Sequence, residues 1–313
     1  MTEIGIVIVT YNSGAEIAAC LQAALRTGAE IVVVDNASTD NTIAEISRCG
    51  VRLIANPENR GFAAAVNQGV VTLHTPYIVL LNPDAVIQSG LDAMRAACDL
   101  PNTAGAGGKL VNPDGQSQRG FMVRRLPTAR NLVMEALLLN RLWPNNPANR
   151  RYRALDLDDR VRTAVEQPAG AFLMVRRAVW DEVQGFDESF QPLWFEDVDF
   201  CRRIANCGYR FYYEPQGVAN HTGAHSIRRI GLEIRAFYWY RSLLRYSAKH
   251  FRPWKFRVVC FAVLTGSVLR SVSESTWHRS LKPLEVYVRV FRFAGRCFLF
   301  GWRNGVVVSG PNR

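Results

Sequence analysis

The 313-residue sequence lacks the features that mark several protein classes. Its seven cysteines are odd in number and scattered, and none forms a CxxC pair or a Cys/His cluster with the spacing of a structural zinc site. Internal repeats and low-complexity tracts are also missing, and a composition that is 48% apolar does not indicate disorder or a fibre. These absences argue against a structural zinc site and favour a reduced, cytosolic setting.

Signals for export or for crossing a membrane are also missing. The opening stretch MTEIGIVIVTYNSG has no basic leader, and its apolar run ends on polar turn residues, so we do not expect a signal peptide. No run of about 18 uncharged apolar residues occurs, and the longest candidate, Val258–Leu269, is shorter than a bilayer requires. We therefore do not expect a membrane-spanning helix.

Acidic residues are scarce at one end of the chain. Residues 226–313 contain 3 Asp and Glu against 17 Lys and Arg, a net charge of +14. Residues 1–225 have a net charge of −3, so the whole excess of +11 lies in the last part. This asymmetry predicts two parts with different functions, residues 1–225 and a basic, aromatic-rich helical region over residues 226–313.

Short runs of Ile and Val alternate with segments of helical periodicity over the first 81 residues. The predicted strands are Ile4–Val9, Glu30–Val34, Val51–Ala55 and Tyr77–Leu81. The predicted helices are Ala15–Arg26, Asn41–Arg48 and Gly61–Leu73. This alternation predicts an α/β fold with a Rossmann-like, mostly parallel sheet flanked by helices. Ligands of such sheets bind beyond the carboxyl ends of the strands.

The pattern is less regular after residue 100. The elements expected there, in chain order, are a long loop or flap at Leu126–Arg162, a strand at Glu166–Arg176 with Gly170 inside it, a helix that begins in FEDVDF and is closed by Gly208, a strand at Tyr209–Tyr213, and a polar loop at Val218–Ser226. From Ile227 the sequence predicts helices.

Polar residues follow each of the first four predicted strands. They are Thr10-Tyr11-Asn12, Asp35-Asn36, Asn56 with Glu58-Asn59-Arg60, and Asn82-Pro83-Asp84. Any one group is consistent with an ordinary turn, but four that meet at one edge of a sheet predict a binding site. Asp84 alone would be interpreted as a turn aspartate or as a ligand of a divalent metal.

Four motifs in order carry a family resemblance: IVIVTYNSG, IVVVDNASTDNT, NRGFAAAVNQG and LLNPDA. Together they resemble glycosyltransferase family 2, the inverting nucleotide-sugar transferases with a GT-A fold. The NPD form of the last motif is similar to the rhamnosyltransferase-like branch, which extends bacterial cell-surface glycans. The resemblance covers roughly residues 4–225.

The resemblance implies a role for each motif residue in binding a nucleotide sugar. Thr10, Tyr11 and Asn12 would line the base and ribose pocket, and Asp35 would bond the base or ribose, although a helix cap or turn is an equal alternative for Asp35. The residues that would approach the nucleotide and its diphosphate are Asn59, Arg60, Gly61, Asn67, Asn82 and Asp84.

The resemblance also implies a divalent metal, Mg²⁺ or Mn²⁺. Asp84 would be one ligand, and because Asn82 replaces the first aspartate of the usual DxD pattern, a second ligand is needed. His221 is the candidate, with His225 as a second choice; the alternative is that these histidines are simply exposed in a loop.

The segment WFEDVDF is implied to hold the catalytic group. Asp197 would be the general base, and Glu196 would position the acceptor or tune Asp197. Asp199 faces another side of the helix and is predicted to be structural. The acceptor side is assigned to Lys109, Gly170 and Trp194, with a surface lysine and a packing glycine as the open alternatives.

These implications give one functional hypothesis. The protein would transfer a sugar, with dTDP-rhamnose as the favoured donor, to a hydroxyl of a glycan or lipid-linked oligosaccharide in cell-surface polysaccharide synthesis. The alternative is a non-catalytic nucleotide-sugar or glycan-binding module on the same fold. The basic region is predicted either to contact an anionic membrane surface or to pack and form a homo-oligomer, and no nucleic acid is expected. The predicted location is the cytoplasm, peripheral on the inner face of the cell membrane.

Overall fold

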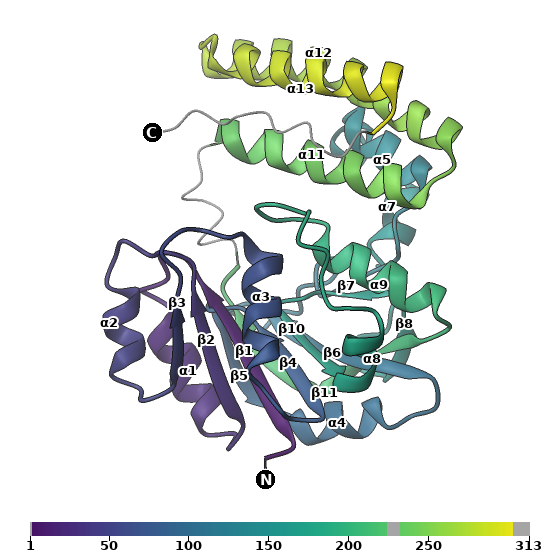
Figure 1. The fold of residues 1–313 in the computed structure, drawn as a ribbon. Helices are drawn as coiled ribbons and strands as arrows, with labels where there is room; N and C mark the ends of the chain where they lie inside the picture. Colours follow the sequence, from purple (N-terminus) through teal and green to yellow (C-terminus); the bar gives the residue numbers. More distant parts are fainter. Residues whose placement is uncertain (1, 224–231, 303–313) are drawn as a thin grey trace. The chain divides into compact units, whose positions relative to one another are not determined.

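The computed structural model describes residues 2–223 and 232–302. The chain divides into two compact units (Figure 1). The first unit contains Met1–Leu126 and Asn146–Gly231, and the second contains Pro127–Asn145 and Leu232–Arg313. The predicted boundary at residues 225 and 226 lies outside the described residues. The assignment of Pro127–Asn145 to the second unit has no counterpart in the sequence-based division.

The first unit is built on a nine-stranded sheet with the order β3-β2-β1-β4-β10-β6-β11-β5, and β8 pairs with β11. The strands are β1 (Ile4–Thr10), β2 (Glu30–Asp35), β3 (Arg52–Ala55), β4 (Tyr77–Leu81), β5 (Ala85–Ser89), β6 (Thr103–Val111), β8 (Thr163–Val165), β10 (Phe172–Arg176) and β11 (Arg210–His221). The strands β3, β2, β1 and β4 are parallel, as are β6 and β11. The strand β10 runs antiparallel between β4 and β6. A separate two-stranded sheet pairs β7 (Val123–Arg124) with β9 (Gln167–Pro168).

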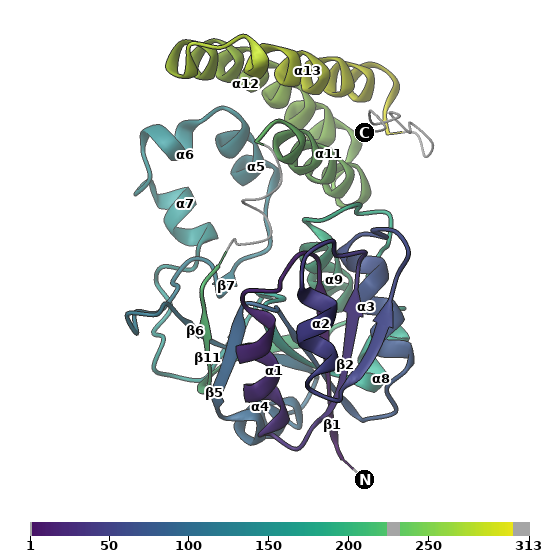
Figure 2. The ribbon, with the colours of Figure 1, turned by 90° about the vertical axis from the view of Figure 1, so that its left-hand side faces the viewer.

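Helices cover both faces of the large sheet, as Figure 2 shows for α1 and α4 on one side of the strands and α3 and α8 on the other. The helices of the first unit are α1 (Ile17–Leu25), α2 (Thr42–Ser47), α3 (Phe62–Val71), α4 (Leu91–Cys98), α7 (Pro147–Tyr152), α8 (Arg177–Glu182) and α9 (Glu196–Asn206). Along β1, Ile6 and Ile8 face the core shared with α1, whereas Val7 faces Gly69 of α3. This alternation is the period of two that a strand buried on both faces requires.

The predicted fold class is confirmed. The first four strands and the helices between them agree with the sequence-based bounds to within two residues. They were predictable because each strand is a buried apolar run and each helix has an apolar stripe. The C-terminal helices expected from residue 227 onward are also present, within the described residues.

Three later expectations are wrong. The segment Leu126–Arg162 contains three helices, α5 (Ala129–Ala136), α6 (Leu139–Leu142) and α7, rather than a long loop. Its Asn and Pro residues cap helices: Asn146 accepts a bond from the N–H of Asn149, and Pro147 occupies the first turn of α7. The strand expected over Glu166–Arg176 is broken at Ala169–Ala171 into β9 and β10, which belong to different sheets. The loop expected at Val218–Ser226 begins as strand, because β11 continues to His221.

The second unit is helical. Its helices are α5 (Ala129–Ala136), α6 (Leu139–Leu142), α11 (Leu232–His250), α12 (Pro253–His278) and α13 (Lys282–Phe300). The helices α11, α12 and α13 pack on one another, and α5 packs on α12. A Cβ placed on Gly266 would lie 2.0 Å from the carbonyl oxygen of Ala136, so the absence of a side chain permits the close approach of α5 and α12. Both residues at this contact belong to the second unit.

Among the described residues, one helix is long and apolar enough to span a membrane by length and composition. It is the Pro253–Trp277 part of α12, and 44% of its most apolar window is buried inside the protein. The sequence-based expectation considered only the uncharged run Val258–Leu269. This run is shorter than the helix because charged residues interrupt the apolar run without interrupting the helix.

Candidate active site

Chain segments that are distant in sequence meet beyond β4. The last residue of β4, Leu81, pairs with Phe172 at the start of the antiparallel strand β10. At the end of β11, His221 pairs with Ala85 at the start of β5. The turn Asn82–Asp84, which joins β4 to β5, therefore lies beside both the entry to β10 and the end of β11. This is the sheet edge at which the sequence predicted a site.

The ends of β1 and β2 are tied together by a buried carboxylate. The hydroxyl of Thr10 donates a 2.8 Å hydrogen bond to Oδ1 of Asp35, and both side chains are fully buried. Oδ2 of Asp35 accepts a bond from the N–H of Ser38 at 2.9 Å. Next to them, Oδ1 of Asn12 accepts a bond from the N–H of Thr39 at 2.8 Å. These bonds brace the two strand ends, and Tyr11 between them is exposed.

The N-terminus of α3 is hydrogen-bonded to the loop that contains Pro192. The N–H of Phe62 donates a 2.8 Å bond to the carbonyl oxygen of Pro192, and the N–H of Gly61 donates a 2.9 Å bond to Oδ1 of Asn59. Gly61 has φ = 84°, a conformation that favours glycine, and a Cβ there would lie 3.1 Å from the oxygen of Pro192. Asn59 and Arg60 are exposed. Their contact with a diphosphate stays a prediction.

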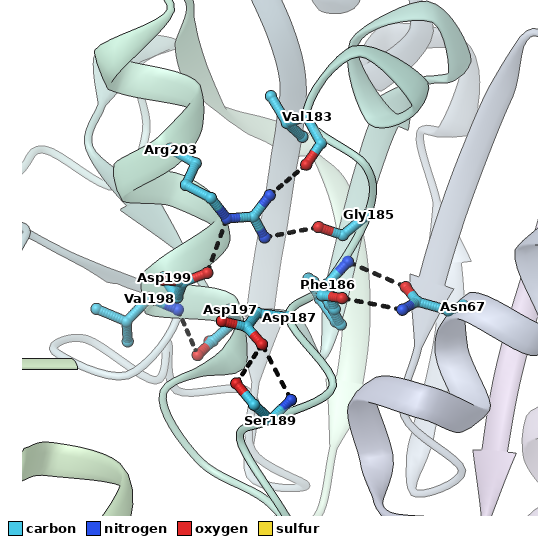
Figure 3. A network of polar contacts seen from close by, with 10 residues as sticks. All are labelled: Asn67, Val183, Gly185, Phe186, Asp187, Ser189, Asp197, Val198, Asp199 and Arg203. Atoms are coloured by element: carbon cyan, nitrogen blue, oxygen red, sulfur yellow. Dashed lines mark hydrogen bonds and ion pairs between the residues drawn. The ribbon is translucent and has the colours of Figure 1, made fainter. Parts of the chain in front are cut away.

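The amide of Asn67 makes contacts that the sequence did not predict. Its Nδ2 donates to the carbonyl oxygen of Phe186 at 2.9 Å, and its Oδ1 accepts from the N–H of Phe186 at 3.0 Å (Figure 3). The same Nδ2 also lies 3.0 Å from a carboxylate oxygen of Glu188. Both ends of the amide therefore hold the turn that precedes α9 against α3. These contacts favour a packing role over the predicted contact with a nucleotide.

Asp84 and His221 face each other at the end of the sheet. Oδ1 of Asp84 lies 3.4 Å from Nε2 of His221, and both side chains are largely buried, with 10% and 3% exposed. The amide nitrogen of Asn82 lies 3.5 Å from the same Nε2. The thiol of Cys20 packs behind this turn, 3.5 Å from the carbonyl oxygen of Asn82, and burial followed by the charge of Asp84 raises its pKa. The predicted pair of metal ligands is thus brought together.

The donor chemistry of this pair fits a divalent cation. A carboxylate oxygen and an imidazole nitrogen that converge can both bind Mn²⁺, and Mg²⁺ prefers the oxygen. No group of three or more His, Cys, Asp or Glu side chains that could hold a metal occurs within residues 2–223 and 232–302. A metal bound here would therefore need further oxygen ligands from water or from a substrate. His225, the second choice, lies outside the described residues.

The acidic start of α9 contains two adjacent carboxylates in different surroundings. Glu196 is buried, and its Oε2 has no hydrogen-bond partner. Asp197 is half-buried; its Oδ1 accepts a 2.8 Å bond from the N–H of Val198, and its Oδ2 lies 3.3 Å from the amide nitrogen of Gln167. Because Asp197 has donors and partial exposure, it is the carboxylate of the pair that is better able to ionise.

Burial changes the proton affinity of both groups. Burial, and then the neighbouring charge of Asp197, raises the pKa of Glu196 well above its usual value. Burial also raises the pKa of Asp197, while the N–H of Val198 and the charge of Arg124 oppose that rise. A carboxylate with a raised pKa is a stronger base than an exposed one, which suits proton abstraction near neutral pH.

Sequence reasoning missed two residues that flank Asp197. In the small sheet, Arg124 of β7 pairs with Gln167 of β9, and this pairing places a cation and an amide near Asp197. The guanidinium of Arg124 is held by the carbonyl oxygen of Gly120 at 2.9 Å. No local signal marks these residues, because β7 and β9 are two residues long and lie far from α9 in the chain.

Asp199 has the structural role that the sequence predicted. Its side chain is fully buried and pairs with Arg203 one turn later, at 2.8 Å. Arg203 also donates to the carbonyl oxygens of Val183 and Gly185, so one guanidinium joins α9 to the turn after α8 (Figure 3).

The three acceptor candidates differ in their surroundings. Gly170 lies against the predicted base, since a Cβ there would be 3.7 Å from the Cβ of Asp197. Trp194 is half-buried, two residues before Glu196, in a left-handed conformation with φ = 75°. Lys109 pairs with Asp159 at 3.5 Å, so its amine already has an anionic partner. This pairing agrees with the alternative of a structural lysine.

Residues 5–163 match the family model described as Glycosyl transferase family 2. The chain belongs to glycosyl transferase family 2. A relative in Mycobacterium tuberculosis, N-acetylglucosaminyl-diphospho-decaprenol L-rhamnosyltransferase, is 30% identical over 282 residues, which cover 80% of this chain and 90% of that protein. Rhamnosyltransferase WbbL of Escherichia coli is 27% identical over 176 residues, which cover 55% of this chain and 62% of that protein.

Solved structures agree with the fold of this family 2 protein. A mannosyltransferase from Pyrobaculum calidifontis, PcManGT, determined in complex with GDP-Man and Mn²⁺, is similar with a TM-score of 0.52 and 16% identity. The match covers 96% of this chain and 88% of that one. The structure of GalNAc-T7 with UDP, GalNAc and Mn²⁺ is similar with a TM-score of 0.51 and 14% identity, covering 71% of this chain and 44% of that one. These likenesses establish a GT-A-like fold.

The family and the relatives together confirm that this chain is a glycosyltransferase of family 2 with rhamnosyltransferase homologues. The predicted resemblance to the rhamnosyltransferase-like branch is likewise confirmed. The roles of the individual site residues and the different functions of the two units stay predictions.

Proposed function

We propose that this glycosyltransferase moves a sugar, with inversion, from a nucleoside-diphosphate sugar to a hydroxyl of a lipid-linked glycan, using Asp197 as the general base and a divalent cation held by Asp84 and His221. The observation that carries the proposal is the placement of both groups at one sheet edge. Gly170 lies beside Asp197, and the next residue, Ala171, accepts a 3.0 Å bond from the N–H of Asn82. Asp197 is thus linked to the turn Asn82–Asp84 through Gly170 and Ala171.

The donor and acceptor classes follow from the relatives. Both similar proteins are named as rhamnosyltransferases, and the mycobacterial one is named for a lipid-diphosphate acceptor that bears N-acetylglucosamine. We therefore favour dTDP-rhamnose as donor and a diphospho-lipid-linked glycan of the cell surface as acceptor. The exposed Tyr11 and the half-buried Asn12 would bind the nucleoside, and the buried pair Thr10 and Asp35 would hold the two strand ends behind them.

The half-buried carboxylate of Asp197 accepts the proton of an acceptor hydroxyl in the proposed reaction. The hydroxyl oxygen attacks the anomeric carbon from the face opposite the diphosphate as the bond from that carbon to the diphosphate oxygen breaks. Burial raises the pKa of Glu196 well above its usual value, which favours Asp197 as the ionised member of the pair. The carboxylate of Asp84 and the imidazole of His221 would hold the cation, which neutralises charge on the leaving diphosphate when bound.

A transfer assay tests this proposal directly. The full-length protein is incubated with dTDP-rhamnose, Mn²⁺ and a synthetic N-acetylglucosaminyl-diphospho-lipid, and the glycolipid product is analysed by mass spectrometry and by NMR of the new linkage. We expect a rhamnosylated product of inverted anomeric configuration that does not form when EDTA is present. A product of retained configuration, or equal rates with and without EDTA, would contradict the mechanism.

The second unit offers a surface for the lipid part of such an acceptor. Exposed apolar residues recur at spacings of three, four or seven positions along α12, which places them on one face of the helix. They are Trp254, Val258, Phe261, Val268 and Val272. The helix α13 has a similar series, consisting of Leu284, Val288, Phe291 and Leu299. We call these two series the apolar stripes of α12 and α13.

Basic residues accompany these stripes. The exposed cations on α12 and α13 include Lys255, Arg257, Arg289, Arg292 and Arg296. On α13, Arg289 and Arg292 each directly follow a member of the apolar stripe, so they flank it on the helix surface. Long basic side chains beside an apolar stripe match the boundary between acyl chains and anionic headgroups. We therefore propose that α12 and α13 lie on an anionic membrane surface, which would place the enzyme at the inner face of the cell membrane.

Vesicle binding tests the membrane surface. The full-length protein is sedimented with phosphatidylglycerol vesicles and with phosphatidylcholine vesicles, and the double variant Phe261→Ser/Val272→Ser is compared with Val161→Ser, an exposed valine of the first unit. We expect binding to the anionic vesicles that the double variant loses and Val161→Ser keeps. The alternative is that the stripes form a homo-oligomer interface. In that case the wild type is a dimer by light scattering, the double variant is a monomer, and neither protein binds vesicles.

A further inference from the structure

The side chain of Gln118 contacts His221 at two points. Its Oε1 lies 2.9 Å from Nδ1 of the imidazole, and its Nε2 donates a 2.6 Å bond to the backbone carbonyl oxygen of His221. The same Nε2 donates a 2.8 Å bond to Oδ1 of Asn112. Both amide hydrogens of Gln118 therefore point at carbonyl oxygens, and this fixes which end of the amide faces the imidazole.

The orientation of the amide decides which ring nitrogen carries a hydrogen. Because Oε1 of Gln118 has no hydrogen to give, Nδ1 of His221 must be the donor of their bond. In the neutral ring Nε2 then carries no hydrogen, and this atom lies 3.4 Å from Oδ1 of Asp84 and 3.5 Å from the amide nitrogen of Asn82. Two lone-pair atoms that face each other across this distance repel, and a cation that binds both removes this repulsion.

The rest of the segment fixes the plane of the ring. The aromatic ring of Phe121 stacks on the imidazole with centroids 5.3 Å apart and planes 11° apart. The backbone of Gln118 is anchored to β6, where its N–H donates to the carbonyl oxygen of Leu110 at 2.8 Å, and its own carbonyl oxygen accepts from Met122 at 3.0 Å. The glutamine is therefore held by bonds that do not involve its side chain.

We propose that Gln118 is a positioning residue that holds His221 as the Nδ1–H tautomer and so directs Nε2 at the cation shared with Asp84. The identity of that cation rests on the proposed function, whereas the tautomer is a property of the metal-free protein. A hydrogen bond to the second nitrogen of a ligating histidine fixes its tautomer and orientation, and its loss costs about 10–100-fold in metal affinity.

The tautomer can be read without any metal. The full-length protein is labelled with ¹⁵N-histidine, and long-range ¹H–¹⁵N spectra are recorded at about pH 8.5, above the ordinary histidine pKa. The chain has five histidines, and the signal missing from His221→Asn identifies the one of interest. We expect the Nδ1–H tautomer in the wild type and a shift to the Nε2–H tautomer in Gln118→Met, which keeps the length of the side chain but has no acceptor.

Two further variants separate positioning from folding. Gln118→Glu keeps an acceptor opposite Nδ1 and should retain the Nδ1–H tautomer. Gln116→Met changes an exposed glutamine of the same turn and should change nothing. An Nε2–H tautomer or a doubly protonated ring in the wild type would overturn the proposal, as would an unchanged tautomer in Gln118→Met with a wild-type melting temperature.

Metal binding provides the second measurement. Mn²⁺ is titrated into the protein with dTDP present, and free Mn²⁺ is measured by electron paramagnetic resonance. We expect Gln118→Met to weaken binding about 10–100-fold and Gln118→Glu to weaken it less. If the wild type shows the Nδ1–H tautomer but binds no Mn²⁺, the metal role in the proposed function fails while the positioning role stands. If Mn²⁺ binds equally to wild type and Gln118→Met, the positioning role fails alone.

Discussion

Gly170 lies against Asp197, with only 3.7 Å between the Asp197 Cβ and the position a Cβ would take on the glycine. Because Gly170 is followed by Ala171, whose carbonyl oxygen is bonded to Asn82, the base candidate and the ligand turn are neighbours although more than a hundred residues separate them in the chain. The antiparallel strand β10 makes this possible, since it begins where β4 ends.

Replacing Asp197 by asparagine should remove the base without changing the shape of the site. We expect turnover to fall about 10²–10⁴-fold, the usual contribution of a positioned base. The affinity for dTDP, measured by isothermal titration with Mn²⁺ present, should stay within about twofold, because Asp197 does not contact the nucleotide in the proposed geometry. Turnover within about threefold of wild type would exclude Asp197 as the base.

The raised pKa of Glu196 makes stability depend on pH. As pH rises past the ordinary glutamate pKa, the unfolded chain loses this proton before the folded protein does, so stability declines until the folded pKa is passed. Glutamine at position 196 does not titrate. The melting temperature of Glu196→Gln minus that of the wild type should therefore have its lowest value at low pH and should increase as pH rises. Differential scanning calorimetry of the ligand-free protein measures this, with the exposed Glu58→Gln as control; a difference that stays flat with pH would contradict it.

Arg203 should matter for stability far more than an exposed arginine with a comparable partner. Arg203→Met leaves the fully buried carboxylate of Asp199 without its cation, and we expect a loss of about 3–5 kcal/mol in unfolding free energy. Arg48→Met breaks the exposed pair with Glu45 and should cost about 0–1 kcal/mol. Urea unfolding followed by circular dichroism compares the two variants, and equal losses would show that the Asp199 pair has no special role.

Weakening the proposed ligand pair of Asp84 and His221 should raise the Mn²⁺ concentration that the enzyme requires. In Asp84→Asn one charged ligand becomes neutral, so the Mn²⁺ concentration for half-maximal transfer should rise by at least about 10-fold, the lower end of the effect of outer partners alone. Asp92→Asn, an exposed aspartate at the start of α4, serves as control. An Asp84→Asn enzyme with a wild-type Mn²⁺ requirement would mean that the ion binds elsewhere.

The sequence was most informative where structure is local. The strands β1, β2 and β4 are apolar runs buried on both faces, so their bounds follow from composition. The strand β11 was cut short because Glu214-Pro215-Gln216-Gly217 interrupts its pattern. In the structure the pairing of β11 with β6 shifts register between Glu214 and Val218, and the irregularity accommodates the proline and glycine. The strand therefore continues to His221.

The surroundings of the site could not be predicted in the same way. Nothing in GGKLVNPDGQSQRG marks Gln118 as the partner of a histidine 103 residues later, because the contact depends on how β6 and β11 are placed side by side. The motifs identify side chains that carry out chemistry in many chains. The residues that orient them, here Gln118 and Gln167, are determined by long-range packing.

The second unit is made of two separate stretches of chain, and this limits how the protein can be cut. A truncation that ends near residue 225, where the change in charge suggests a boundary, would remove α12 but leave α5 attached. The buried side of α5 that contains Leu132 and Ala136 would then face water, and the shortened protein would be prone to aggregate. A soluble catalytic fragment would require excision of Pro127–Asn145 as well, with a short linker joining the two new ends.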